Sequence, residues 1–315
     1  MGISSFLKLV EIQTTVASLL PYMLGTMFAL YKFNNFNAKE GVVLFLGALF
    51  FDMTTTAFNN YVDYTKAIKR EGFGYERHNA IGRDNLNLNK VKYIIITMLL
   101  ISIASGLVLF LKTDITVFII GVICFSIGIL YSFGPIPISR TPFGEIFSGM
   151  TQGFLLTFLV VYIHVYDQGI INLEMSNEIV KLLVNIKFFI AIFIISLPVV
   201  TGISNIMLAN NICDMEDDLE NKRYTLPIYI GKERALQVYK ITYYIGFISI
   251  VVGVATKLLP VVSLVALIAL KPINDNMKAF FKVQSKKDTF ALSVKNFVIS
   301  NVIYIGTLLI GYVIM

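Results

Sequence analysis

Long apolar runs with few or no charges recur along the whole chain, and they constrain its fold more than any other feature of the sequence. Most of them approach the roughly 20 residues that a helix needs to cross a bilayer. The runs are Ile12 to Tyr31, Gly41 to Val62, Tyr93 to Leu111, Ile115 to Phe133, Ile146 to Tyr166, Phe188 to Ala209, Gln237 to Thr256, Leu258 to Leu270 and Phe297 to Met315. The eighth run is short. We therefore predict an all-α, polytopic membrane bundle of about nine transmembrane helices, forming one domain over residues 1–315.

Basic residues lie mostly on one side of this predicted bundle. With the N-terminus in the cytoplasm, 20 of the 26 Lys and Arg residues fall on the cytoplasmic side, as the positive-inside rule requires. The net charge of +6 therefore reflects membrane orientation, and the sequence contains no compact basic domain that would indicate nucleic-acid binding. We predict a multi-pass protein of a bacterial cell membrane, in contact with membrane lipid.

The sixth apolar run ends in the polar stretch Asn-Asn-Ile-Cys-Asp-Met-Glu-Asp-Asp. If the helix continues, Asn210, Asp214 and Asp218 share one face at four-residue spacing, and Asn211 lies three residues before Asp214. Acids are unfavourable at the C-terminal end of a helix, so such a cluster calls for a cation. Carboxylate and amide oxygens are the ligands that suit Mg²⁺.

The second apolar run ends in a related way, with Asn59, Asn60 and Asp63. One isolated pair of acids at this spacing is more often a solvated surface, but two polar helix ends of the same design favour a common site. We expect Asn59, Asp63, Asp214 and Asp218 to hold Mg²⁺ at the cytoplasmic helix ends. The similarity also suggests an eroded internal repeat that relates helices 1–4 to helices 5–8.

An aspartate also lies inside the second run. Asp52 shares a helical face with Asn59 and Asp63, about three turns away from Asp63. An ionisable residue at membrane depth usually faces a polar cavity or a partner. A catalytic role for Asp52 and a protonated side chain hydrogen-bonded to a neighbouring helix are both compatible with the pattern.

Two connections carry further candidate residues. The loop from residue 64 to residue 90 is basic and rich in glycine. It could close over an anionic head group beside Asp63, with Lys66 and Arg83 as candidate contacts, and its charges also orient the protein in the membrane. The stretch from Tyr131 to Glu145 contains three prolines and two glycines, which predict a rigid, non-helical connection. The basic stretch 271–295 is expected to form a loop near lipid head groups.

Together these motifs resemble the intramembrane aromatic prenyltransferases of the UbiA type, most closely the 1,4-dihydroxy-2-naphthoate polyprenyltransferases. The resemblance covers nearly the whole chain. It rests on Asn210, Asn211, Asp214, Asp218, Arg223, Thr225 and Leu226 in the second motif, on Asn59, Tyr61 and Asp63 in the first, and on Tyr131, Gly134, Pro135, Gly144 and Glu145. Departures from the family pattern include Asn60 in place of an acid, and Cys213 and Leu219 in place of arginines.

The resemblance implies a Mg²⁺-dependent transfer of a polyprenyl group from polyprenyl diphosphate to 1,4-dihydroxy-2-naphthoate, giving demethylmenaquinone. Asp52, Asp63, Asp214 and Asp218 would be catalytic. Substrate-binding residues would be Asn59, Asn60, Lys66, Arg83, Tyr131, Asn210, Asn211 and Arg223. Another aromatic acceptor, such as 4-hydroxybenzoate, is an alternative.

A cation-coupled transporter is the alternative from a different functional class, with the four aspartates forming an ion path. A transporter needs its carboxylates near the bilayer midplane. Three of these four lie at predicted helix ends, which favours the enzyme.

Overall fold

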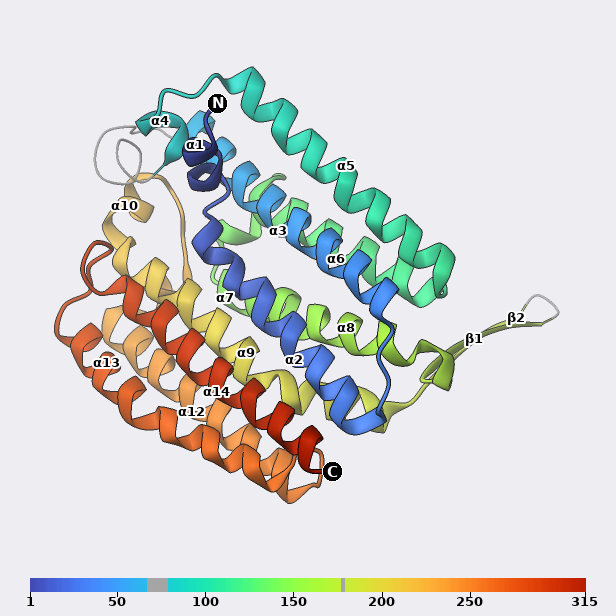
Figure 1. The fold of residues 1–315 in the computed structure, drawn as a ribbon. Helices are drawn as coiled ribbons and strands as arrows, with labels where there is room; N and C mark the ends of the chain where they lie inside the picture. The colour runs from blue at the N-terminus through green and yellow to red at the C-terminus, as the bar shows by residue number, and fades with distance from the viewer. Residues whose placement is uncertain (67–78, 177–178) are drawn as a thin grey trace.

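In the computed structural model, which describes residues 1–66, 79–176 and 179–315, long helices run side by side between two ends of a bundle (Figure 1). Eight helices of the described chain are long and apolar enough to cross a membrane. They are Ile12–Phe33 (η1 Ile12–Thr15 and α2 Val16–Phe33), α3 Ala38–Lys66, α5 Leu88–Lys112, α6 Ile115–Ser132, Gly144–Gln168, α9 Ile186–Cys213, α12 Lys232–Ala255 and α14 Phe290–Ile314. The all-α, polytopic fold predicted from the apolar runs is confirmed.

A ninth helical segment combines η6, Val261–Ala269, with α13, Leu270–Lys282, and lies beside α12 and α14 (Figure 1). The sequence predicted a helix that stops at Leu270 and a loop over residues 271–295. The loop prediction is wrong as far as Lys282 and again from Phe290, where α14 begins. Ile273, Met277 and Phe280 are buried on one side of α13. Their helical spacing forms an apolar stripe along one face. The mean hydropathy of the segment is low, because lysines and an aspartate occupy the opposite face.

Short helices gather at one end of the bundle, called here the site end. They are α1 Ile3–Leu9, α4 Ala80–Arg83, η3 Ile138–Arg140, α10 Met215–Glu220 and α11 Leu226–Ile230. A small apolar cluster that includes Val10, Ala57 and Ile81 joins α1 and α4 to α3 and α5. Of the predicted loop over residues 64–90, the first three residues belong to α3 and residues 67–78 lie outside the described chain.

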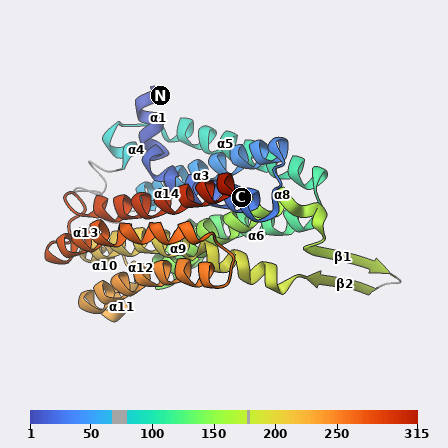
Figure 2. The same cartoon turned by 60° about the horizontal axis from the view of Figure 1, so that its bottom comes forward.

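At the opposite end, β1 Ile171–Ser176 and β2 Ile179–Val184 pair antiparallel, with Ile171 opposite Val184. The hairpin projects beyond the helices in both views (Figures 1 and 2). Nothing in the sequence had indicated strands here. The hairpin lies far from the site end, so it does not bear on the chemistry below.

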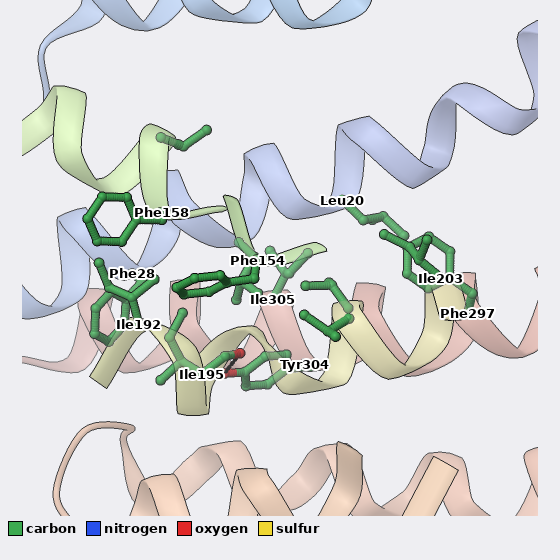
Figure 3. Close-up of a cluster of buried hydrophobic side chains, with 14 of the residues drawn as sticks. Leu20, Phe28, Phe154, Phe158, Ile192, Ile195, Ile203, Phe297, Tyr304 and Ile305 are labelled. Carbon is green, nitrogen blue, oxygen red and sulfur yellow. Dashed lines mark hydrogen bonds between the residues drawn. The ribbon is translucent and has the colours of Figure 1, made fainter. Parts of the chain in front are cut away.

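The central core packs α2, α14 and the helix Gly144–Gln168 against α9, with Phe154, Phe158, Ile192 and Ile195 among the buried side chains (Figure 3). The helix Gly144–Gln168 is built from α7 Gly144–Ser148, η4 Gly149–Leu155, α8 Leu156–Val165 and η5 Tyr166–Gln168, and η4 is a π-helical turn. A Cβ at Gly153 would lie 2.6 Å from the Cα of Val200 on α9. Glycine therefore lets the two backbones come together, as small residues do between membrane helices.

Candidate functional site

The polar end of α9 keeps its helical hydrogen bonding past Cys213. The amide of Asp214 donates to Asn210 O at 3.1 Å, and the amide of Asp218 donates to Asp214 O at 2.8 Å. Asn210, Asp214 and Asp218 are therefore linked one turn apart, although the single continuing helix that was predicted is broken at Asp214, between the end of α9 and the start of α10. The ammonium of Lys286, which precedes α14, donates to both Asn210 Oδ1 and Asp214 Oδ2.

Arg223 joins the ends of α3 and α9. Its Nε lies 3.1 Å from Asp218 Oδ1, and its Nη1 lies 3.6 Å from Asp63 Oδ2. Asp218 is only 4% exposed, and its other carboxylate oxygen accepts a hydrogen bond from the Thr225 hydroxyl at 3.3 Å. The two polar helix ends thus meet around one guanidinium.

Burial sets the ionisation of this cluster. Burial, together with the charge of Asp214, raises the pKa of Asp218 to about 6, although Arg223 opposes the rise. For Arg223, burial alone would lower the pKa, but the carboxylates of Asp218 and Asp63 outweigh it and the pKa lies above its ordinary value. The guanidinium is therefore a permanent positive charge, and Asp218 takes up a proton as the pH falls through about 6.

Three unpartnered oxygens adjoin the carboxylates. Asn211 donates to Glu145 Oε1 at 2.9 Å. The remaining oxygens of Asn211 and Glu145, and the hydroxyl of Tyr131, are buried without a hydrogen-bond partner among the described residues. Glu145, Arg223 and Asp63 are the charged neighbours of that hydroxyl. Unpaired buried polar groups are costly, so such a group of oxygens indicates a place for a ligand.

The first polar helix end is only partly directed at the cluster. Asn59 accepts a hydrogen bond from the Ser132 hydroxyl at 3.0 Å, beside Tyr131. Asn60 instead donates to Leu9 O and to Glu11 Oε1, both at 3.1 Å. These contacts connect α3 to the N-terminal segment and do not support the substrate-binding role predicted for Asn60.

The two predicted cationic residues lie nearby on the same end. Lys66 has its ammonium 5.1 Å from the centre of the Phe133 ring, next to Ser132. Arg83 donates to Asp84 Oδ1 at 2.8 Å on α4. The contacts described for these residues do not bring them to the carboxylates.

Asp52 lies deeper in the bundle than the other aspartates. Asp52 precedes Asp63 by eleven positions on α3, which is about 16 Å along the helix axis. The side chain is 6% exposed, and Gln152 on the π-helical turn η4 donates to its Oδ1 at 2.9 Å. Its Oδ2 has no hydrogen-bond partner within the described chain. Gln152 thus holds one oxygen of the carboxyl group, and the side chain of Ser18 on α2 also lies beside the group.

Sequence reasoning missed Lys286 and Gln152 and gave Glu145 only the role of opening a helix. The acids at the end of α9 did call for a cation, but nothing marked Lys286 among the many lysines of its stretch. Gln152 had a signal, because an amide inside an otherwise apolar run needs a hydrogen-bond partner. Glu145 is 3% exposed, a burial that no sequence pattern indicated.

The two neighbouring residues of the first motif should respond differently to truncation. We expect Asp63→Ala to lower turnover by about a hundredfold, because a carboxylate of the cluster is lost. Asn60→Ala should lower turnover by less than about tenfold and should act chiefly on the thermal midpoint, because its hydrogen bonds hold Leu9 and Glu11. Turnover of the two purified variants, with their melting curves, tests this ranking, and the reverse order would place Asn60 in the site.

The oxygen atoms of this cluster are suitable ligands for Mg²⁺, although Lys286 and Arg223 contact them in this structure. No three His, Cys, Asp or Glu side chains are grouped to hold a metal ion in the part of the chain that the structure describes. Carboxylate and amide oxygens from Asn210 and Asp214 nevertheless converge on one ammonium, and Asp63 and Asp218 on one guanidinium. Each pair is already arranged around positive charge, and hard oxygen donors of this kind bind Mg²⁺.

Comparison with known proteins identifies the family of this chain. The sequence model of the UbiA prenyltransferase family matches residues 18–300. The chain belongs to the UbiA prenyltransferase family. It is therefore a prenyltransferase with multiple membrane-spanning helices, and the resemblance seen in its motifs is confirmed.

A bacterial enzyme is similar to this prenyltransferase over most of its length. The 1,4-dihydroxy-2-naphthoate octaprenyltransferase of Bacillus subtilis is 28% identical over 251 residues, which are 78% of this chain and 71% of that enzyme. The shared length includes most of the membrane bundle.

Two solved structures share the fold. A UbiA homolog from Aeropyrum pernix superposes with a TM-score of 0.70 at 16% identity, over 95% of this chain and 98% of that one. A UbiA homolog from Archaeoglobus fulgidus, bound to GPP and Mg²⁺, gives a TM-score of 0.65 at 14% identity, over 98% of this chain and 99% of that one.

Proposed function

We propose that this prenyltransferase transfers a polyprenyl group from polyprenyl diphosphate to 1,4-dihydroxy-2-naphthoate, giving demethylmenaquinol, the reduced form of demethylmenaquinone, with Mg²⁺ as its cofactor. The observation that carries the proposal is the meeting of Asp63 and Asp218 around Arg223. It places carboxylates from two helix ends within reach of one ligand. The similarity to the Bacillus subtilis octaprenyltransferase supports the choice of acceptor.

The chemistry explains why this arrangement is useful. Loss of diphosphate from an allylic carbon leaves negative charge on the leaving group, and fixed positive charge lowers that barrier. Bound Mg²⁺ supplies this charge as a Lewis acid. Asn59, Asp63, Asp214 and Asp218 would hold the metal, while Arg223 offers its guanidinium to the diphosphate.

Other residues of the site end have roles in binding. The free oxygen of Asn211 and the Tyr131 hydroxyl lie beside the carboxylates and would contact the substrate, and Asn210 supports Asp214. Lys66 and Arg83, at the same end, would contact the diphosphate once substrate is present. The metal and diphosphate would therefore bind at the surface of the membrane. We assign this surface to the cytoplasmic side, because most Lys and Arg residues lie on it.

The acceptor would bind deeper, near Asp52. Its free Oδ2 can accept a hydrogen bond from a ring hydroxyl or take its proton, while Gln152 fixes the other oxygen. The apolar helices around the site would keep water from the allylic cation. Attack by the carboxylated ring carbon, followed by loss of CO₂, completes the proposed reaction.

The acceptor can be tested directly with purified enzyme in lipid. We expect 1,4-dihydroxy-2-naphthoate and a polyprenyl diphosphate to give a prenylated, decarboxylated product by mass spectrometry, and 4-hydroxybenzoate to give none. Product from 4-hydroxybenzoate alone would contradict the acceptor but leave prenyl transfer standing. Prenyl transfer to neither would contradict both acceptors.

The metal site should also depend on pH in a defined direction. Asp218 takes up a proton as the pH falls through its pKa of about 6, and a protonated carboxyl binds Mg²⁺ poorly. Calorimetric Mg²⁺ affinity should therefore be nearly constant above pH 7 and fall by up to about tenfold per unit below pH 6. An affinity that does not change between pH 7 and pH 5 would exclude Asp218 as a ligand.

A further inference from the structure

Lys286 lies in a part of the site that no motif of the sequence marks. Its ammonium donates to Asn210 Oδ1 and Asp214 Oδ2, the oxygens of a one-turn pair at the end of α9. Asn210 also donates to Asp214 Oδ2 at 3.3 Å, so the three groups form a closed set. A cation from the far end of the sequence therefore stands where the proposed function requires metal and diphosphate.

The backbone around Lys286 is fixed by a tight turn between α13 and α14. The amides of Thr289 and Phe290 both donate to Ser285 O at 3.0 Å. The Ser285 hydroxyl donates to Asp288 Oδ2 at 2.8 Å, and the Thr289 hydroxyl donates to Val283 O at 2.8 Å. The turn therefore presents Lys286 at a set position.

The surroundings of the Lys286 side chain favour a positive charge. The Lys286 side chain is 17% exposed, and its ammonium lies 5.4 Å from the centre of the Phe290 ring, a distance at which the ring face attracts a cation. The C-terminal end of α9 also favours positive charge. A lysine is a compact charge on a flexible stem, and it commonly binds phosphate as a point charge.

We propose that Lys286 is a diphosphate-binding residue, held on Asp214 in the metal-free protein and transferred to the substrate diphosphate when Mg²⁺ takes Asn210 and Asp214. The proposal rests on the function proposed above. Asp214 cannot give its oxygen to both a metal ion and the ammonium, so the two compete. An anionic diphosphate arriving with the metal offers the displaced ammonium a new partner within the reach of its stem.

The test compares Lys286→Gln with Lys287→Gln. Lys287 is the next residue of the same turn and is exposed, so its variant removes the same charge from the same segment. Binding of a non-reactive polyprenyl thiodiphosphate with Mg²⁺ is measured by calorimetry, together with KM and kcat. We expect Lys286→Gln to weaken thiodiphosphate binding and raise KM for the diphosphate by about tenfold or more, and Lys287→Gln to change either by less than about twofold. Lys286→Arg should recover most of the lost affinity.

A second measurement follows the competition with metal. Mg²⁺ binding without thiodiphosphate should be tighter in Lys286→Gln than in wild type, by about threefold or more, because the competing ammonium is gone. Weaker Mg²⁺ binding in this variant would contradict the competition.

Three results would overturn the proposal. They are unchanged thiodiphosphate binding with only a lower thermal midpoint, an equal loss in Lys287→Gln, and a loss confined to acceptor affinity. Failure of the proposed function looks different, because wild-type protein would then bind no thiodiphosphate even with Mg²⁺ present.

Discussion

Replacing Asp214 or Asp218 with asparagine should lower turnover by about a hundredfold or more while the protein stays folded. The change keeps the size of the side chain but removes one negative charge from the proposed metal and diphosphate site. At Asp218 it also removes a partner of the Arg223 guanidinium. Initial rates with saturating polyprenyl diphosphate and acceptor measure the effect, and addition of EDTA to wild type should reproduce it.

Asp217 provides the matched control for this experiment. It lies in the same acidic stretch but is exposed, so Asp217→Asn should leave turnover within about twofold of wild type. Full activity of Asp214→Asn or Asp218→Asn, or of wild type in chelator, would remove these residues from the metal site. Melting curves of all three variants separate lost chemistry from lost structure.

The second large effect is expected at Asp52. Asp52→Ala should lower kcat/KM for the naphthoate by about a hundredfold, because the oxygen that receives the ring hydroxyl is lost. KM for the diphosphate should change by less than about twofold, since Asp52 lies about 16 Å along α3 from Asp63. Asp52→Asn distinguishes two roles, because asparagine keeps a hydrogen-bonding oxygen but cannot take a proton.

A suitable control removes another hydrogen bond to α3 inside the bundle. Ser102 on α5 donates to Gly47 O at 2.8 Å, so Ser102→Ala tests the general cost of such a change. Equal losses in Asp52→Ala and Ser102→Ala would indicate a structural role for Asp52. A rise in KM for the diphosphate with no effect on the naphthoate would contradict the placement of the acceptor.

Much of the membrane fold could be predicted because apolar runs of sufficient length have few alternatives in a bilayer. The four-residue spacing of Asn210, Asp214 and Asp218 also predicted the hydrogen bonds that link them one turn apart, since helical periodicity is local, but not the break between α9 and α10 at Asp214. That Asp63 would meet Asp218 required a long-range argument, and the repeated design of the two helix ends provided it. Arg223, which directly follows the turn at Asn221 and Lys222, could be proposed only through the family motif.

Other features depend on contacts that local patterns do not encode. Asn60 and Asn59 look equivalent in sequence, yet one residue of helical rotation directs Asn60 to Leu9 and Glu11. Charged residues on the opposite face of α13 lower the mean hydropathy of this helix, so the apolar run ended at Leu270 while the helix continues to Lys282. Nothing in the sequence distinguishes Lys286 from the other lysines of its stretch, and only the folded turn before α14 places its ammonium beside Asp214.

The glycine contacts of the helix Gly144–Gln168 have a consequence for attempts to redesign this enzyme. A Cβ at Gly149 would lie 2.1 Å from Ser204 Oγ, and one at Gly153 would lie 2.6 Å from the Cα of Val200. Gln152 stands between these two positions and holds Asp52. Directed evolution toward new acceptors should therefore find few tolerated changes at the glycines, and libraries should instead vary side chains that do not hold two backbones together.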